Sequence, residues 1–140
     1  MNPYPHPLSE NVTSSMKGNR RIDTKPEKRL RSSLHRLGFR FRKDYPITVS
    51  TNRKCRPDVA FTKKKLAVFV DGCFWHQCPE HGHIPSNNNE YWTRKLNGNR
   101  ARDENDNELL TENGWAVLRI WEHMPLDKAL LLVDSSYTQL

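Results

Sequence analysis

The feature that most constrains this chain is a cluster of potential metal ligands directly after a short apolar segment. Two cysteines and a histidine lie within nine residues, with the spacing Cys73-x4-Cys78-x2-His81. Thiolate and imidazole ligands at such short spacing are typical of zinc sites, and an odd total of three cysteines does not favour a disulfide framework. The sequence therefore predicts a zinc-stapled bend in a protein of a reducing compartment.

A closed zinc site needs a fourth ligand, and the sequence offers two candidates. His123, just past a later apolar run, is the first choice, and His83 is the local alternative. The competing interpretation is two free buried cysteines beside surface histidines, with Cys55 incidental. A zinc ion with four protein ligands has no open position, so it would brace the bend and perform no chemistry.

The size and charge of the chain limit its class. Its 140 residues fit one domain with a modest core, because only 35% of them are hydrophobic. An excess of 23 basic over 16 acidic residues favours a polyanionic partner. No apolar run could span a bilayer and no signal peptide is evident, so we expect an intracellular soluble protein with no membrane partner. We expect a flexible tail over residues 1–15, one domain over 16–135 and a frayed end over 136–140.

Hydrophobic periodicity predicts the secondary structure. Thr24, Pro26 and Glu27 are typical of a helix start, and Gly38 predicts its end. Further helices are expected over 90–113 and 126–133, strands over 39–42, 58–61, 66–70 and 115–121, and a polar loop up to residue 54. This order predicts an α/β sandwich around a mixed sheet. The middle of the 90–113 helix is polar on every side, so we expect it to face the site or a partner.

Two aspartates are candidate ligands of a hard cation. A charged hairpin turn joins the strands that carry Asp58 and Asp71, so both carboxylates are expected at neighbouring strand ends. An aspartate after a proline also often just closes a turn. Glu27 fits the capping-box position, and local evidence favours that role alone.

The bend itself carries a histidine and two large aromatics. His76 lies between the two cysteines and is a candidate general base or proton shuttle, with a purely structural histidine as the alternative. Phe74 and Trp75 would most commonly pack in the core. In a basic protein they could instead insert between base pairs.

A set of short segments occurs in a fixed order along the chain: Asp23–Glu27, Arg56–Asp58, Phe69–His76, Glu90–Trp92, Asn99 with Arg102–Asp103, and Gly114 through His123. Through these segments, from Ser14 to Pro125, the chain resembles the very-short-patch repair (Vsr-type) DNA mismatch endonucleases, a branch of the restriction-endonuclease-like PD-(D/E)xK superfamily. The resemblance implies a three-layer α/β/α sandwich around a mixed central sheet, with a structural zinc site.

The resemblance also implies roles for individual residues. The catalytic positions that match are Asp58 (principal Mg²⁺ ligand), the carbonyl of Val70 (second Mg²⁺ contact), His76 (activation of water), and Glu27 and Asp103 (acidic residues near the site). The zinc positions that match are Cys73, Cys78 and His123, with His81 as the fourth ligand. The DNA-contacting positions that match are Phe74, Trp75 and Trp92, which enter the duplex, and the basic arm with Lys17, Arg20 and Arg21.

The chain departs from the family pattern at three points. The best-studied pattern has a longer histidine-rich insert between the two cysteines. It also has a histidine where this chain has Asp71, so Asp71 could bind Mg²⁺ directly. The superfamily lysine after this position is absent, because Gly72 and Cys73 follow, so His76 would take over its work.

The implied activity is an Mg²⁺-dependent nick in one strand of duplex DNA next to a T:G mismatch. We expect a cytoplasmic monomer linked to mismatch repair proteins and a cytosine-5 methyltransferase. The alternatives are a restriction-like or defence nuclease on matched DNA and a non-catalytic zinc-stapled DNA-binding module.

Overall fold

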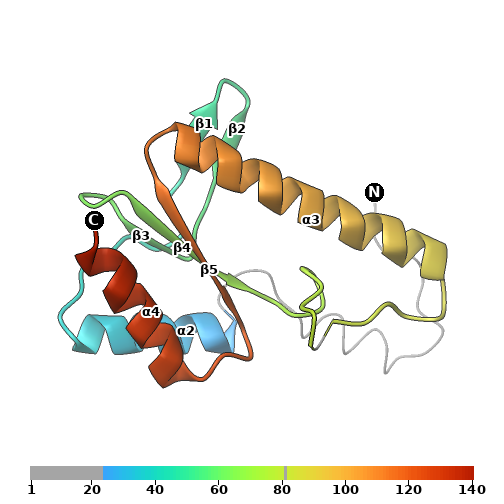
Figure 1. Cartoon of the computed structure of the whole chain (residues 1–140), viewed down its shortest axis with the longest axis horizontal. Coiled ribbons are helices and arrows are strands. Elements are labelled where there is room, and N and C mark those ends of the chain that lie inside the picture. Colours follow the sequence, from blue (N-terminus) through green and yellow to red (C-terminus); the bar gives the residue numbers. More distant parts are fainter. Residues whose placement is uncertain (1–23, 81) are drawn as a thin grey trace.

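A computed structural model describes residues 24–80 and 82–140 of the chain (Figure 1). The predicted tail, Lys17, Arg20, Arg21 and His81 lie outside these residues. The described elements are, in chain order, α2 (Lys25–Arg36), β1 (Ile47–Ser50), β2 (Arg53–Cys55), β3 (Val59–Phe61), β4 (Leu66–Asp71), α3 (Asn89–Glu112), β5 (Ala116–Trp121) and α4 (Leu126–Thr138).

Strand β4 is the centre of a mixed sheet with the order β3-β4-β5. β3 pairs antiparallel with β4, so that Val59 lies opposite Val68. β5 pairs parallel with β4, and this register extends from Leu66 opposite Ala116 to Asp71 opposite Trp121. The apolar run predicted as a strand is therefore confirmed, and its carboxyl end, beyond the last residue paired with β3, is paired with β5.

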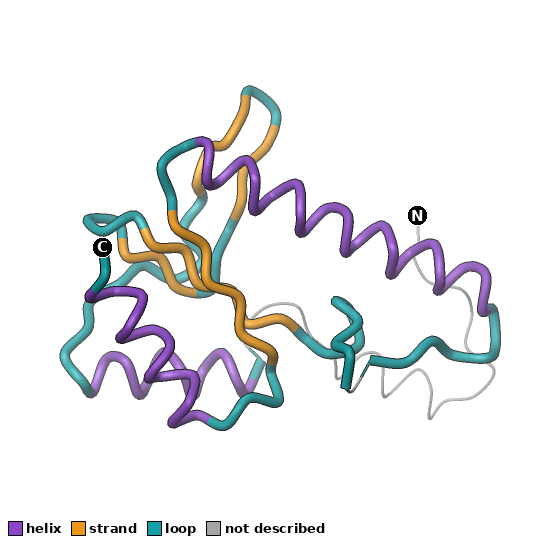
Figure 2. Tube along the Cα trace, viewed as in Figure 1, coloured by secondary structure: helices purple, strands orange, loops and turns teal. Residues whose placement is uncertain are grey.

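The sheet is the middle of three layers (Figure 2). Helices α2 and α4 cover one face through a core that includes Leu34, Val68 and Val133. Helix α3 and the β1-β2 hairpin cover the other face, where Ala67 and Leu110 are buried together. Because side chains alternate along a strand, the neighbours Ala67 and Val68 supply the two opposite cores. The predicted mixed α/β architecture is confirmed.

Helix α2 begins and ends as the sequence predicts. The backbone N–H of Thr24 donates to the Glu27 carboxylate at 3.2 Å, which satisfies a donor that the helix start leaves free. Gly38 follows the helix with a φ of 98°, a conformation that glycine adopts without steric cost.

Three expectations for local structure were wrong. The segment predicted as a polar loop forms the antiparallel hairpin of β1 and β2. The strand expected over 39–42 is reduced to a single bridge between Arg42 and Ala60. Helix α4 continues to Thr138, beyond its expected end at Val133, because Ser135 and Tyr137 still accept helical hydrogen bonds through their carbonyls.

Helix α3 extends well past the edge of the sheet, and the loop after β4 lies beneath it (Figure 1). Its C-terminal half is fixed to the hairpin, because Arg53 donates three hydrogen bonds to Asp106 and the Asn113 amide donates to the Val49 carbonyl. Within the described residues, no helix has both the length and the apolar character that a membrane span requires.

Candidate active site

The loop after β4 is held in a compact bend by its own hydrogen bonds. The backbone N–H of His76 donates to the Gly72 carbonyl, and that of Cys78 donates to the Cys73 carbonyl. Gln77 has a positive φ of 52°, and its side-chain amide donates to the carbonyls of Phe74 and His83. These bonds turn the side chain of His76 toward α3, where it meets an acidic residue.

His76 stands between two carboxylates from different elements. Its Nδ1 atom contacts the carboxylate of Asp103 on α3, and its Nε2 atom lies 3.8 Å from Oδ1 of Asp71 at the end of β4. The side chain is 26% exposed, so solvent and substrate can reach it. The polar middle of α3 therefore faces the site, as the sequence predicts.

Asp71 is held by an arginine from the neighbouring strand. Arg119 Nη1 donates to both carboxylate oxygens of Asp71, at 3.0 and 3.2 Å. Burial raises the pKa of Asp71, while His76 and Arg119 act in the opposite direction. The carboxylate expected as a magnesium ligand is thus engaged in an ion pair.

Asp58 lies at the same end of the sheet but in a separate group. It precedes β3, and its Oδ2 accepts a hydrogen bond of 2.6 Å from the backbone N–H of Val70. Burial raises the pKa of Asp58 to about 8, and the nearby charge of Glu27 adds to this effect. The N–H and C=O of a strand residue point to the same side, so the Val70 carbonyl also faces Asp58.

The structure thus divides the expected catalytic residues into two groups around the end of β4. The first contains Asp58, Glu27 and Val70. The second contains His76 and Asp103, together with Asp71, and the three ligand atoms of this second group lie within 4.8 Å of one another. The two aspartates do occupy neighbouring strand ends, but Asp71 turns toward the histidine and not toward Asp58.

Three of the predicted zinc ligands meet at the end of β5. Cys73, Cys78 and His123 place their ligand atoms together, with Nδ1 of His123 at 3.2 and 3.6 Å from the two sulfurs. Ligands of a tetrahedral zinc ion stand about 3.6 Å apart when zinc–sulfur and zinc–nitrogen distances are ordinary. The residues therefore fit zinc. Burial and the nearby charge of Glu122 raise the pKa of the Cys73 thiol to about 12. A bound metal would displace the proton of this thiol.

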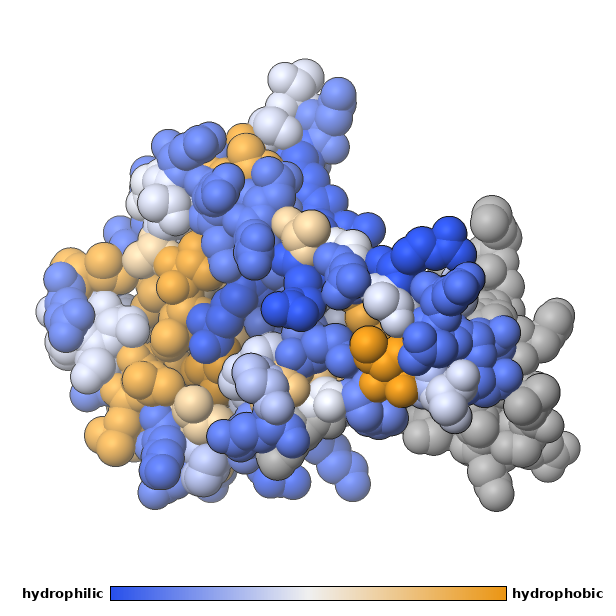
Figure 3. All heavy atoms as spheres, turned by 45° about the vertical axis from the view of Figure 1, so that its right-hand side comes forward, coloured by the Kyte–Doolittle hydropathy of each residue, from blue (hydrophilic) through white to orange (hydrophobic). Residues whose placement is uncertain are grey.

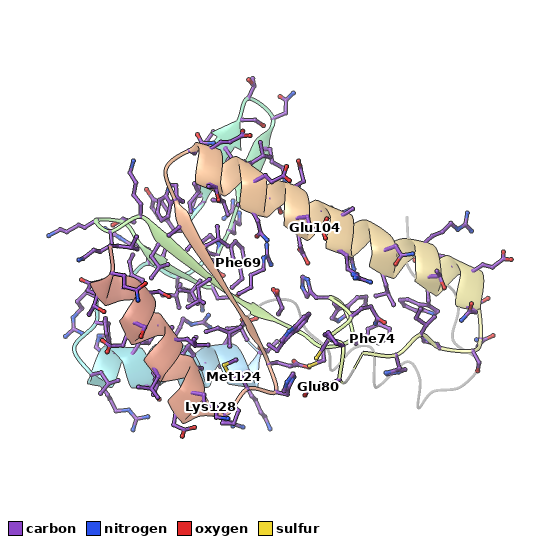
Figure 4. The ribbon with its side chains drawn as sticks, viewed as in Figure 1. Phe69, Phe74, Glu80, Glu104, Met124 and Lys128 are labelled. Atoms are coloured by element: carbon purple, nitrogen blue, oxygen red, sulfur yellow. The ribbon has the colours of Figure 1, made fainter. Side chains whose placement is uncertain are left out.

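The surroundings of this group also fit a metal site. Glu80 approaches the other nitrogen of His123 at 3.5 Å, where carboxylates commonly orient a ligating histidine (Figure 4). We call the bend that carries Cys73, Cys78 and Gly82 the knuckle. A Cβ on Gly82 would lie 2.7 Å from the Cys78 carbonyl oxygen, so the knuckle requires glycine there. His83, the local alternative ligand, packs its ring against Phe74 and is not part of the group.

The aromatic residues expected to contact DNA form a cluster beneath α3. The Phe74 ring meets the rings of Trp75 and Trp92 edge to face, with centroids 5.1 and 5.5 Å apart. Figure 4 shows Phe74 on the loop below the helix. Trp75 and Trp92 are 6% and 1% exposed, so the described structure buries both, while Phe74 is half-buried.

Sequence reasoning missed several residues that shape the site. The polar contacts that it did not anticipate come from Gln77, Asn107, Arg119 and Glu122. The sequence does point to Arg119, because it is the only charged residue within the apolar run of β5. Glu122 accepts a hydrogen bond from the backbone N–H of Cys73, a contact that depends on the parallel pairing of β4 and β5.

Comparison with known proteins gives a consistent result. The family described as DNA mismatch endonuclease Vsr matches residues 9–81. The chain is 49% identical to the type II nicking enzyme V.NaeI of Lentzea aerocolonigenes, over 93% of this chain and 78% of that protein. It is 41% identical to the type II nicking enzyme V.XorIIP of Xanthomonas oryzae, over 71% of each.

A third relative is the DNA mismatch endonuclease Vsr of Escherichia coli, which is 36% identical over 71% of this chain and 62% of that protein. The matched family segment contains Asp58, His76, Cys73 and Cys78. The longer alignments to the relatives cover most of the chain. The chain therefore belongs to the family of the DNA mismatch endonuclease Vsr.

Proposed function

We propose that this endonuclease nicks one strand of duplex DNA next to a T:G mismatch and that it requires Mg²⁺. The observation that carries the proposal is the position of His76, which Asp103 holds near the end of β4, where the backbone N–H of Val70 also binds Asp58. A buried acid and an oriented histidine at one edge of a sheet can hold a metal and activate water. Membership of the family supports the same chemistry.

Asp58 and the Val70 carbonyl would hold Mg²⁺, with Glu27 as a supporting carboxylate. Oxygen ligands of this kind suit a hard cation, and Glu27 is close enough to raise the pKa of Asp58. When bound, Mg²⁺ supplies neutralisation of the charge that develops on the scissile phosphate. Because Asp71 pairs with Arg119, we assign Asp71 to the group that contains His76 and Asp103 and not to the Mg²⁺ ligands.

His76 would act as the general base. Contact of Asp103 with Nδ1 leaves Nε2 as the nitrogen that accepts a proton from the attacking water. The ionised carboxylate of Asp103 fixes the ring and stabilises the imidazolium that then forms, as an acidic partner does in other histidine-dependent hydrolases.

Zinc would be bound by Cys73, Cys78 and His123, with His81 as the fourth ligand. Such a closed site has no position for substrate. Its contribution is to fix the loop between β4 and α3, so that His76 stays opposite Asp103.

The DNA-binding surface would follow α3 and the loop beneath it. Arg94, Arg100 and Arg102 are exposed on this helix and suit contact with phosphates. Hydrophilic residues cover most of the face that Figure 3 brings forward on the side of α3. Lys17, Arg20 and Arg21 would add a basic arm.

Phe74, Trp75 and Trp92 would insert beside the mismatch, and the stacking gained there would offset the cost of unstacking the bases. Because Trp75 and Trp92 are buried in the described structure, their insertion requires the cluster to open. Phe74 is already partly exposed, so its insertion requires the smallest movement.

The experiment is a nicking assay on duplexes that differ at one base pair: T:G, the matched T:A and C:G pairs, and other mismatches. We expect one nick beside T:G with Mg²⁺ and none without it. Asp58→Asn should abolish the nick while retaining binding, whereas Asp127→Asn, the same change on the exposed side of α4, should not affect it. The absence of a nick on every duplex by folded, zinc-loaded protein would refute the proposal.

A second candidate is nicking of matched DNA, and the names of the type II nicking relatives favour testing it. Equal rates on T:G and matched duplexes would support this candidate. The proposed cellular partners, mismatch repair proteins and a cytosine-5 methyltransferase, fit only the mismatch-specific activity, which a monomer would perform on cytoplasmic DNA.

A further inference from the structure

Arg119 is a partly buried cation beside the group of His76, Asp71 and Asp103, called the histidine group. It lies on β5 directly opposite Phe69 of β4, and its guanidinium lies over the Phe69 ring at 4.3 Å from the centroid. Only 18% of its side chain is exposed. A charge placed this deeply requires specific partners, and Arg119 has partners on two other elements.

The guanidinium connects the two carboxylates that flank His76. Its Nη1 atom donates to both oxygens of Asp71 and lies 3.8 Å from Oδ1 of Asp103. Its Nε atom donates to the Asn107 side chain at 2.7 Å, which fixes the arginine from α3. Arg119 therefore ties the end of β4 to the middle of α3.

Without this arginine, the group would resemble a metal site. Two carboxylates and an imidazole within 4.8 Å of one another are a ligand set that divalent transition metals accept. Arg119 already supplies a positive charge beside both carboxylates. A divalent cation in the group would be repelled by the guanidinium and would have to compete with it for the oxygens of Asp71.

We propose that Arg119 is a positioning residue that holds Asp71 and Asp103 around His76 and excludes divalent cations from this group, so that the catalytic metal is taken up beside Asp58. The catalytic part of this inference rests on the proposed function. The exclusion of metal does not, because metal binding is measured without DNA.

The binding test uses Mn²⁺, followed by electron paramagnetic resonance, with zinc-loaded protein. Asp58→Asn is introduced first, so that the proposed catalytic site takes up no Mn²⁺. Adding Arg119→Met, which keeps an unbranched stem over Phe69, should create one new Mn²⁺ site at least tenfold tighter than any in the parent. Adding Asp103→Asn as well should abolish it.

Arg53→Met is the matched control, because Arg53 is likewise hydrogen-bonded to both oxygens of an aspartate, Asp106 of α3, which is not part of the group around His76. It should create no Mn²⁺ site, and neither should Arg119→Lys, which keeps the positive charge. If Arg119→Met does not fold, Arg119→Gln removes the charge and keeps a polar group. A folded variant without the cation that binds no more Mn²⁺ than its parent would overturn the proposal.

The catalytic test separates positioning from a merely structural role. At saturating Mg²⁺, Arg119→Met should lower kcat at least tenfold with little change in KM for the duplex, and Arg119→Lys should recover part of the loss. Arg53→Met should keep the wild-type kcat. An unchanged kcat in Arg119→Met would overturn the positioning role, whereas a wild-type protein without activity would refute only the proposed function.

Discussion

The Nδ1 atom of His76 contacts the carboxylate of Asp103 directly, although the two residues belong to different elements. This contact fixes which nitrogen of the ring is available to water. In the proposed mechanism this nitrogen accepts the proton of water, and the effect of the contact on the reaction can be measured.

Removing the charge of Asp103 should slow the chemical step. We expect Asp103→Asn to lower the single-turnover nicking rate by about 10²-fold or more, because general-base assistance contributes about 10²–10⁴-fold. Duplex affinity, measured without Mg²⁺, should stay within a few fold of wild type. Asp106→Asn, the same change one turn along α3, should leave the rate much less affected. A near-normal rate in Asp103→Asn would show that His76 does not act as the base.

The buried acid Asp58 should make the Mg²⁺-free protein less stable as pH rises. Its pKa is about 8 in the folded protein and 3.8 ordinarily, so between these values only the folded state retains the proton. Raising the pH through this window therefore favours unfolding, with a slope of at most about 1.4 kcal/mol per pH unit, and the effect levels off above pH 8.

Urea unfolding from pH 4 to 9 measures this slope. Asp58→Asn should reduce it, and Glu27→Gln should do so partly, because the charge of Glu27 contributes to the raised pKa of Asp58. The same slope in all three proteins would show that Asp58 does not retain a proton in the fold.

Zinc binding should depend on Cys73 and Cys78 and not on Cys55. We expect Cys78→Ser to lose bound zinc and to lower the melting temperature, since metal binding contributes folding free energy. Cys55→Ala is the matched control. Cys55 is also buried, and burial raises its pKa to about 11, but it lies in β2 away from the group. Zinc content by mass spectrometry decides: equal content in both variants would contradict the site.

Zinc affinity should be sensitive to a substitution of Gly82, the glycine of the knuckle. A Cβ on Gly82 would stand 2.7 and 2.9 Å from backbone atoms of Cys78, which cannot move aside as a side chain could. Gly82→Ala should weaken zinc affinity at least tenfold in a chelator competition. Gly98→Ala, on an open part of α3, should not. Equal affinities in the two variants would show that the knuckle tolerates a side chain.

Local patterns predicted most of the fold. The cap of α2, the apolar runs of β4 and β5 and the glycine after α2 are short-range signals, and they located these elements well. The β1-β2 hairpin was missed because its strands have only four and three residues, too few for the alternation of Ile47 and Val49 with polar residues to stand out. These segments form strands only because the other face of the sheet and α3 cover them.

The site was harder to predict than the fold. Spacing grouped Cys73, Cys78 and His81, with His123 as the first choice for the remaining ligand, and the structure brings Cys73, Cys78 and His123 together while His81 lies outside the described residues. Spacing could not show that Asp71 turns to Arg119 rather than to Asp58, because that choice depends on side-chain directions across three elements. The burial of Trp75 and Trp92 likewise depends on where α3 crosses the loop.

One stripe of α3 carries Trp92, Leu96, Asn99 and Asp103 at spacings of three and four residues. The first three pack on or bond to the aromatic loop, and the last orients His76. An α-helix is stiff over this length of about 16 Å. If Trp92 contacts DNA as proposed, altering it would also shift the geometry around His76, so recognition of the mismatch and cleavage of the strand would be coupled through this helix.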